Sequence, residues 1–111
     1  MKVIYLSGPI THNPDYLRDF NKAENELIVK GYTVLNPAKL PKGLTNEQYM
    51  RIDLAMIDSA DAVVLLPKWT ESQGAQREVD YCRYIKKPVY LSPDALLAHD
   101  TITKEAGPNA D

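Results

Sequence analysis

The run Val3-Ile4-Tyr5-Leu6-Ser7-Gly8-Pro9 decides how the rest of the sequence is interpreted. Its first four residues form a short, continuous apolar run, which is typical of a strand buried on both faces of a sheet. The next three residues, Ser7-Gly8-Pro9, end the run with residue types that favour a turn. Strands of this kind occur in parallel sheets that helices cover on both sides.

Further apolar runs follow at intervals, separated by amphipathic segments. The other predicted strands comprise residues 32–35, 62–66 and 88–91, and the predicted helices comprise residues 15–30, 46–59 and 73–86, with a short one starting near 93. Strands that alternate with helices, without an internal repeat, indicate βαβ units around a parallel sheet. We therefore predict an α/β protein, a three-layer α/β/α domain with a flavodoxin-like or Rossmann-like parallel sheet of four or five strands.

The helix ends carry recognisable capping residues. Thr45 or Asn46 is expected to cap the helix over 46–59, and Thr70 or Ser72 the helix over 73–86, with Thr70 and Gln73 suited to a capping box. The residues expected to face the core from the first helix are Phe20, Ala23, Leu27 and Ile28. Residues 1–99 are predicted to form one domain and residues 100–111 a loose polar tail.

The composition of the 111 residues limits the classes of function. Hydrophobic residues make up 44% and charged residues 25%, as in ordinary globular domains, and the net charge of −2 gives no electrostatic basis for binding nucleic acid or a membrane. No signal peptide or membrane span is recognisable, so a cytoplasmic protein is expected. His12 and His99 lack metal-ligand spacing, which predicts no metal site, and the lone Cys82 is expected in the core.

Two carboxylates occupy positions where a helix should be apolar. Asp53 shares its helix face with Met50, Leu54 and Ile57, and Glu78 shares its own with Gly74, Ala75, Cys82 and Ile85. At about 100° per residue, each acid falls within the stripe that packs on the core. A buried carboxylate is normally paired, protonated or functional. Two of them on successive helices suggest one pocket for acid–base or nucleophilic chemistry.

Purely structural interpretations of these acids also fit the pattern. Glu78 can pair with Arg51 or Arg83 near the surface, and Asp53 can pair with Lys30. A modest rotation of either helix would bring its acid to solvent. These interpretations predict a small interaction protein without catalytic activity.

Ligands of open parallel sheets bind beyond the carboxyl ends of the strands, at the point where the strand order reverses. The loops expected at this edge comprise residues 7–13, 36–45 and 67–73. The third loop contains Trp69, which either stacks on a ligand or covers the sheet edge, and it leads to the helix that carries Glu78.

Two acids in one pocket suit the cleavage of a bond to an anomeric carbon. One carboxylate stabilises or attacks the positive charge of the transition state, while the other protonates the leaving group. For an N-glycosidic bond, Glu78 would be the nucleophile and Asp53 the acid–base group, and Tyr5 would orient Glu78 unless it is only a packed aromatic. Trp69 could stack on the base, and backbone amides near Gly74 could bind a hydroxyl or an anion.

Four segments in this order resemble the nucleoside 2-deoxyribosyltransferase superfamily, which includes the 2-deoxynucleoside 5-phosphate N-hydrolases. They are Val3-Ile4-Tyr5-Leu6-Ser7-Gly8-Pro9, Arg51-Ile52-Asp53-Leu54, Asp61-Ala62-Val63-Val64 and Ser72-Gln73-Gly74-Ala75-Gln76-Arg77-Glu78. The resemblance covers residues 2–92. It is closest to a branch of short bacterial and phage proteins with a Ser-Gly-Pro start and a Gly-x-x-x-Glu helix.

The resemblance implies a role for each matching residue. Glu78 matches the nucleophile that takes up the deoxyribosyl group, Asp53 matches the acid near base and sugar, and Tyr5 matches the tyrosine that orients the glutamate. Ser72 stands where the hydrolases bind the 5-phosphate. From the motifs and the resemblance together, the expected substrate-binding residues are Ser7, Gly8, Pro9, Ile10, Trp69, Ser72 and Gly74. The resemblance also implies a homodimer or larger homo-oligomer that needs no cofactor.

The resemblance leaves the substrate open between a nucleoside and a nucleoside 5-monophosphate. Where the hydrolases carry a Ser-Ile-Arg-Gly-Gly turn after the first strand, this chain reads Pro9-Ile10-Thr11-His12-Asn13. The predicted function is cleavage or transfer of an N-glycosidic bond through a covalent glycosyl–glutamate intermediate. The alternative is a module on the same scaffold that binds a nucleotide or related metabolite without turnover.

Overall fold

A computed structural model describes residues 2–105 of the chain. Its four strands form one parallel sheet in the order β2-β1-β3-β4. The strands are β1 (Val3–Ser7), β2 (Thr33–Leu35), β3 (Ala62–Leu65) and β4 (Val89–Tyr90). The strand order reverses between β1 and β3, whose register pairs Ser7 with Leu65. The switch point is therefore at the carboxyl ends of these two strands.

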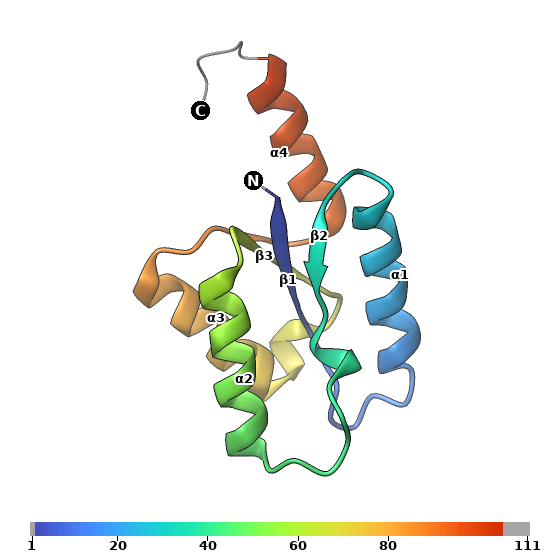
Figure 1. Ribbon diagram of the computed structural model, residues 1–111, viewed down its shortest axis with the longest axis vertical. Helices are drawn as coiled ribbons and strands as arrows, with labels where there is room; N and C mark the ends of the chain where they lie inside the picture. Colours follow the sequence, from blue (N-terminus) through green and yellow to red (C-terminus); the bar gives the residue numbers. More distant parts are fainter. Residues whose placement is uncertain (1, 106–111) are drawn as a thin grey trace.

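Helices cover both faces of the sheet (Figure 1). They are α1 (Tyr16–Ile28), α2 (Asn46–Ser59), α3 (Gln73–Ile85) and α4 (Pro93–Glu105). Helices α1 and α4 lie on one face, while α2 and α3 lie on the other. The described part of the chain is thus a three-layer α/β/α fold with a four-stranded parallel sheet, as the order of elements in the sequence predicts.

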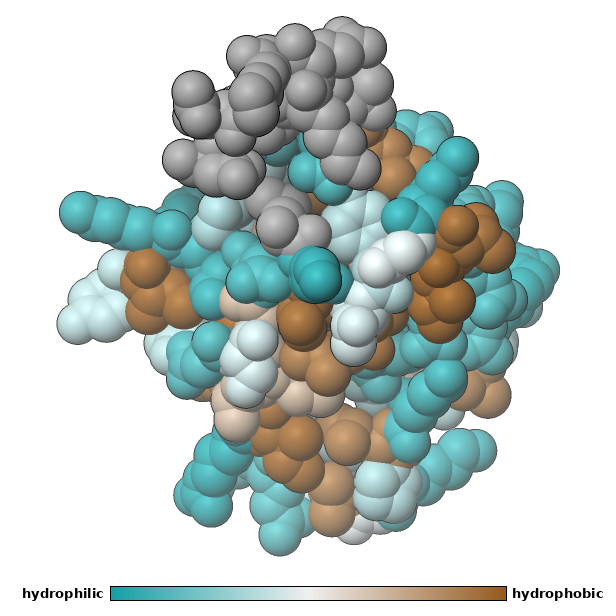
Figure 2. Space-filling model, turned by 45° about the horizontal axis from the view of Figure 1, so that its top comes forward, coloured by the Kyte–Doolittle hydropathy of each residue, from teal (hydrophilic) through white to brown (hydrophobic). Residues whose placement is uncertain are grey.

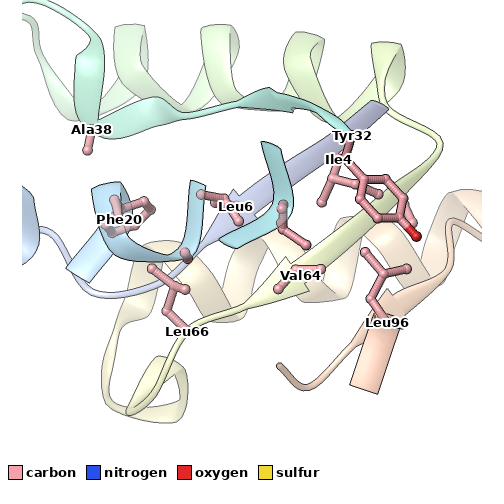
Figure 3. Packing of buried hydrophobic residues seen from close by; sticks show 11 residues of the cluster. Ile4, Leu6, Phe20, Tyr32, Ala38, Val64, Leu66 and Leu96 are labelled. Atoms are coloured by element: carbon pink, nitrogen blue, oxygen red, sulfur yellow. The ribbon is translucent and has the colours of Figure 1, made fainter. Parts of the chain in front are cut away.

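Each face of the sheet has its own apolar cluster. On the α1/α4 face, Ile4, Leu6 and Val64 from the strands pack with Phe20 and Leu96 from the helices (Figure 3). On the α2/α3 face the buried residues are Tyr5, Ile57, Ala60, Val63, Leu65, Val79 and Cys82. Since successive residues of a strand point to opposite faces, each strand contributes alternate residues to the two clusters.

Capping fixes where the two helices of the α2/α3 face begin. The Thr45 hydroxyl accepts a hydrogen bond from the Gln48 amide, and the Gln48 side chain accepts one from the Thr45 amide, which completes a capping box. Ser72 caps α3. The predicted box between Thr70 and Gln73 is wrong, because Thr70 lies within a short 3-10 helix, η2 (Trp69–Glu71), that precedes Ser72.

Two further expectations need correction. Ile28 is 50% exposed, not inward, because it lies about 100° around the helix from Leu27, which is fully buried and marks the inward side of the last turn. The last helix was expected to be short, with a loose tail from residue 100, but α4 continues to Glu105. Within the described residues the tail predicted over 100–111 is thus helical as far as residue 105, and its remainder lies outside them.

The surface is mixed in character. Hydrophilic and hydrophobic side chains are interspersed over the face shown in Figure 2. The large apolar residues with substantial exposure are Leu17, Ile28, Val29, Tyr84 and Leu91. Within residues 2–105, no helix has both the length and the hydropathy that a bilayer-spanning segment requires.

Candidate functional site

Strand β1 delivers two hydroxyl groups to the α2/α3 face of the sheet. Tyr5 and Ser7 are two residues apart, so they share a face, while Ile4 and Leu6 point to the opposite cluster. Tyr5 is fully buried and Ser7 is 1% exposed. Ser7 is the last residue of β1 and therefore lies at the switch point.

Both hydroxyl groups donate a hydrogen bond to the same carboxylate oxygen. The Tyr5 hydroxyl lies 3.0 Å from Oε1 of Glu78, and the Ser7 hydroxyl lies 2.8 Å from that atom. Glu78 is 5% exposed and belongs to α3. The inward orientation that helical periodicity predicts for Glu78 is therefore confirmed.

Asp53 approaches the same place from α2. It is 8% exposed, and it lies near enough to Glu78 for its charge to raise the pKa of that residue. Its Oδ1 atom is buried and has no hydrogen-bond partner among the described residues. A buried, unpartnered acceptor is uncommon in native proteins, and a bound ligand is one way to satisfy it.

Burial and mutual charge shift the protonation of this pair. Burial, followed by the charge of Asp53, raises the pKa of Glu78 to about 8, although the hydrogen bonds from Ser7 and Tyr5 oppose the rise. Burial also raises the pKa of Asp53. Two neighbouring carboxyl groups with raised pKa values share a proton near neutral pH. One can then act as an acid while the other is ionised.

Tyr5 remains protonated beside these acids. Burial first, and then the negative charges of Glu78 and Asp53, raise the pKa of Tyr5 well above its usual value. Tyr5 is therefore a permanent hydrogen-bond donor rather than a base.

The ion pairs that would make the acids purely structural are not formed within residues 2–105. Arg83 pairs with Asp80 on the same helix, at 3.4 Å, instead of with Glu78. Neither Glu78 nor Asp53 contacts a cationic side chain in the described part of the chain. No group of three or more potential metal ligands gathers among the described residues.

The turn after β1 leads to the α1/α4 face of the sheet. A Cβ atom on Gly8 would lie 2.7 Å from Cβ of Leu66, so this glycine permits the close packing of two neighbouring chain segments. Ile10 packs against the cluster on the α1/α4 face, and Pro9 lines a charged groove on that side. Ile10 and Pro9 therefore have contacts on the α1/α4 side of the sheet, whereas Tyr5 and Ser7 point to the α2/α3 side.

Three other expected binding residues surround the start of α3. Trp69 packs against the cluster on the α2/α3 face. The Ser72 hydroxyl accepts a hydrogen bond from the Ala75 amide at 3.2 Å, while its own hydrogen is free to donate. A Cβ atom on Gly74 would approach no other residue closer than 3.9 Å, so packing does not require a glycine there.

The contact between Ser7 and Glu78 is the part of the site that sequence reasoning missed. Ser7 was expected to bind substrate, whereas in the structure its hydroxyl is bonded to Glu78. The signal was present in the sequence, since a residue two positions after Tyr5 in a strand must share its face.

Comparison with known proteins agrees with this fold. The solved structure of a 2-deoxyribosyltransferase from the psychrotolerant bacterium Bacillus psychrosaccharolyticus, described as a suitable biocatalyst for the industrial synthesis of antiviral and antitumoral nucleosides, matches with a TM-score of 0.66. The two sequences are 28% identical, and the match covers 82% of this chain and 72% of that chain. The protein therefore belongs to the nucleoside 2-deoxyribosyltransferase-like superfamily.

A family model also matches most of the chain. Residues 2–91 match the family described as a domain of unknown function (DUF4406), and the chain belongs to it. A search among curated proteins finds no significant match to the sequence.

Proposed function

We propose that the protein cleaves or transfers the N-glycosidic bond of a nucleoside or nucleoside 5-monophosphate. The observation that carries this proposal is the pair formed by Glu78 and Asp53, both buried, with no cationic side chain among residues 2–105 to neutralise them. Separate acid and nucleophile roles for two such carboxyl groups suit an oxocarbenium-like transition state. The likeness to a 2-deoxyribosyltransferase supports the same class of substrate.

In the proposed first step, the shared proton resides on Asp53, and the ionised Glu78 attacks the anomeric carbon while the bond from that carbon to the base breaks. The bonding electrons leave with the base, which takes the proton from Asp53. A covalent glycosyl–Glu78 ester remains. In the second step water or another base attacks the ester, loses its proton to Asp53 and releases Glu78 as a carboxylate.

Other parts of the proposal rest on position and resemblance. Trp69 and Gly74 border the start of α3, where a base and a sugar would bind near the acids. Ser72 keeps a free hydroxyl hydrogen for a hydroxyl or phosphate oxygen. A homodimer or larger homo-oligomer, acting in the cytoplasm on a small-molecule substrate without a cofactor, accords with the resemblance.

Chromatography of reaction mixtures tests this function. Wild type is incubated with a panel of nucleosides and their 5-monophosphates, with and without a second free base, beside Glu78→Gln. Glu24→Gln is a matched control, because Glu24 is also buried but pairs with Lys39 away from the proposed site. We expect wild type and the control to release free base and Glu78→Gln to release none.

The same mixtures separate the possible outcomes. A new nucleoside in the two-base mixtures identifies a transferase, and free base alone identifies a hydrolase. A glycosyl adduct on the intact protein, absent from Glu78→Gln, supports the covalent intermediate. Retention of a ligand in native mass spectra, with no turnover of any substrate, would support the non-catalytic binding module instead.

A further inference from the structure

The hydrogen bonds to Glu78 distinguish its two oxygen atoms. Tyr5 and Ser7 both donate to Oε1, at 3.0 Å and 2.8 Å, and both belong to the same rigid strand. A carboxylate oxygen has two lone pairs, so two donors fill the hydrogen-bonding capacity of Oε1. No hydrogen bond to Oε2 from these hydroxyl groups competes with a reacting atom.

The same contacts restrict where the shared proton can reside. A proton on Oε1 would point at a hydroxyl group that already donates to this atom, which is unfavourable while both donors stay in place. The proton therefore belongs to Oε2 or to Asp53. In either place the proton is available to Asp53, the proposed acid that would deliver it to a leaving base.

We infer that Ser7 is a positioning residue which, together with Tyr5, occupies Oε1 of Glu78 and so leaves Oε2 as the attacking oxygen that faces the proton of Asp53. The attack by Oε2 rests on the proposed function, whereas the fixing of Oε1 does not. In the attack, Oε2 forms the bond to the anomeric carbon, and the proton on Asp53 moves to the departing base. Ser7 itself contacts neither substrate nor base in this step.

The burial of Ser7 supports this role over substrate binding. Its side chain is 1% exposed, beneath the turn that begins at Gly8, and its hydroxyl hydrogen is already committed to Glu78. A buried hydroxyl without a partner would destabilise the strand, because its water contacts would be lost without replacement. The hydrogen bond to Glu78 accounts for its presence.

Two readouts test the inference, one of which is independent of turnover. The carboxyl signal of Glu78, assigned as the one missing from Glu78→Gln, is titrated by ¹³C NMR in wild type, Ser7→Ala and Ser7→Thr. Loss of a donor to a charged group destabilises the carboxylate, so Ser7→Ala should raise the titration midpoint by about one pH unit. Ser7→Thr keeps the hydroxyl and should restore the midpoint.

The second readout is the pH profile of cleavage. Ser7→Ala should lower kcat about ten- to a hundredfold, leave KM nearly unchanged and move the pH optimum to higher values. Cys82→Ala is the matched control, because Cys82 is fully buried one turn after Glu78 and donates no hydrogen bond to it. This variant should unfold more easily but keep the wild-type pH profile.

Each outcome decides a different part of the inference. An unchanged Glu78 midpoint in Ser7→Ala, with kcat within about twofold of wild type, would overturn the role of Ser7. A raised midpoint in a protein that cleaves no nucleoside would support the fixing of Oε1 and refute the proposed function. If Ser7→Ala does not fold, Ser7→Cys serves instead, since a thiol is a weak donor and should raise the midpoint in the same direction.

Discussion

Replacing Glu78 by glutamine should stabilise the protein at alkaline pH while abolishing any chemistry that depends on the carboxylate. The amide oxygen can still accept hydrogen bonds from Tyr5 and Ser7, and the amide nitrogen can donate to Asp53. The variant therefore keeps the contacts of the site but removes a charge that is buried beside another acid.

The expected size of the effect follows from the pKa of Glu78. Its value of about 8 in the folded protein, against a usual 4.5, means that the folded state binds this proton more tightly than the unfolded state. This contribution to wild-type stability is full below pH 4.5 and is lost as the pH rises through about 8. Each pH unit within that interval corresponds to about 1.4 kcal/mol, so the difference between variant and wild type should approach an upper limit of about 5 kcal/mol.

Urea unfolding at pH 5, pH 6.5 and pH 8.5 measures this difference. We expect the free energy of unfolding of Glu78→Gln to exceed that of wild type by an amount that grows with pH. Glu24→Gln is the control, since Glu24 forms an ion pair with Lys39 at 2.6 Å and its replacement should destabilise the fold. Parallel pH dependences of wild type and Glu78→Gln would refute the reasoning, because they would show that Glu78 does not titrate abnormally.

Three further predictions concern neighbouring positions. Gly74→Ala should raise the free energy of unfolding by about 0.5–1 kcal/mol, because alanine favours helices and its Cβ meets no obstacle. The same variant should raise KM in the cleavage assay, and a lower free energy of unfolding would contradict the prediction. Gly8→Ala should lower that free energy by about 1–3 kcal/mol in urea unfolding, because its Cβ would overlap the Leu66 side chain, and a neutral effect would contradict the packing argument. Asp53→Asn should lower the pKa of Glu78, measured by ¹³C NMR, because a repelling charge is removed. It should also abolish cleavage, and an unchanged titration of Glu78 would show that the two acids do not interact.

Local patterns predicted the elements and the faces of the two acids, because strand and helix periods decide which side chains share a face. Glu78 and Asp53 each stood out as a charge within an apolar stripe, and both are buried. The sequence left the strand order open between a flavodoxin-like and a Rossmann-like sheet, because strand pairing joins segments far apart in the sequence, and the observed order β2-β1-β3-β4 is the flavodoxin-like one. The bond between Ser7 and Glu78 spans 71 positions and depends on that order.

Element ends were predicted less well than element interiors. Ile28 fits the apolar period of α1 but lies at the edge of the inward stripe, and periodicity does not indicate how wide a stripe the core covers. Thr70 and Ser72 are both good capping residues, and the choice between them depended on the short helix η2, which local preference does not reveal. Contacts with the rest of the fold decide both the exposure of Ile28 and the choice of Ser72 as the cap of α3.

The alternation of residues in β1 limits how this protein can change during evolution. Tyr5 and Ser7 reach the acids, while Ile4 and Leu6 fill the opposite core. Insertion or deletion of one residue in this strand would exchange the two sets, placing hydroxyl groups in the apolar core and aliphatic side chains against Glu78. Such a change would remove stability and the site in a single step. Substitutions on the α1/α4 side can accumulate independently, so lineages can adjust thermal tolerance there without disturbing the acids.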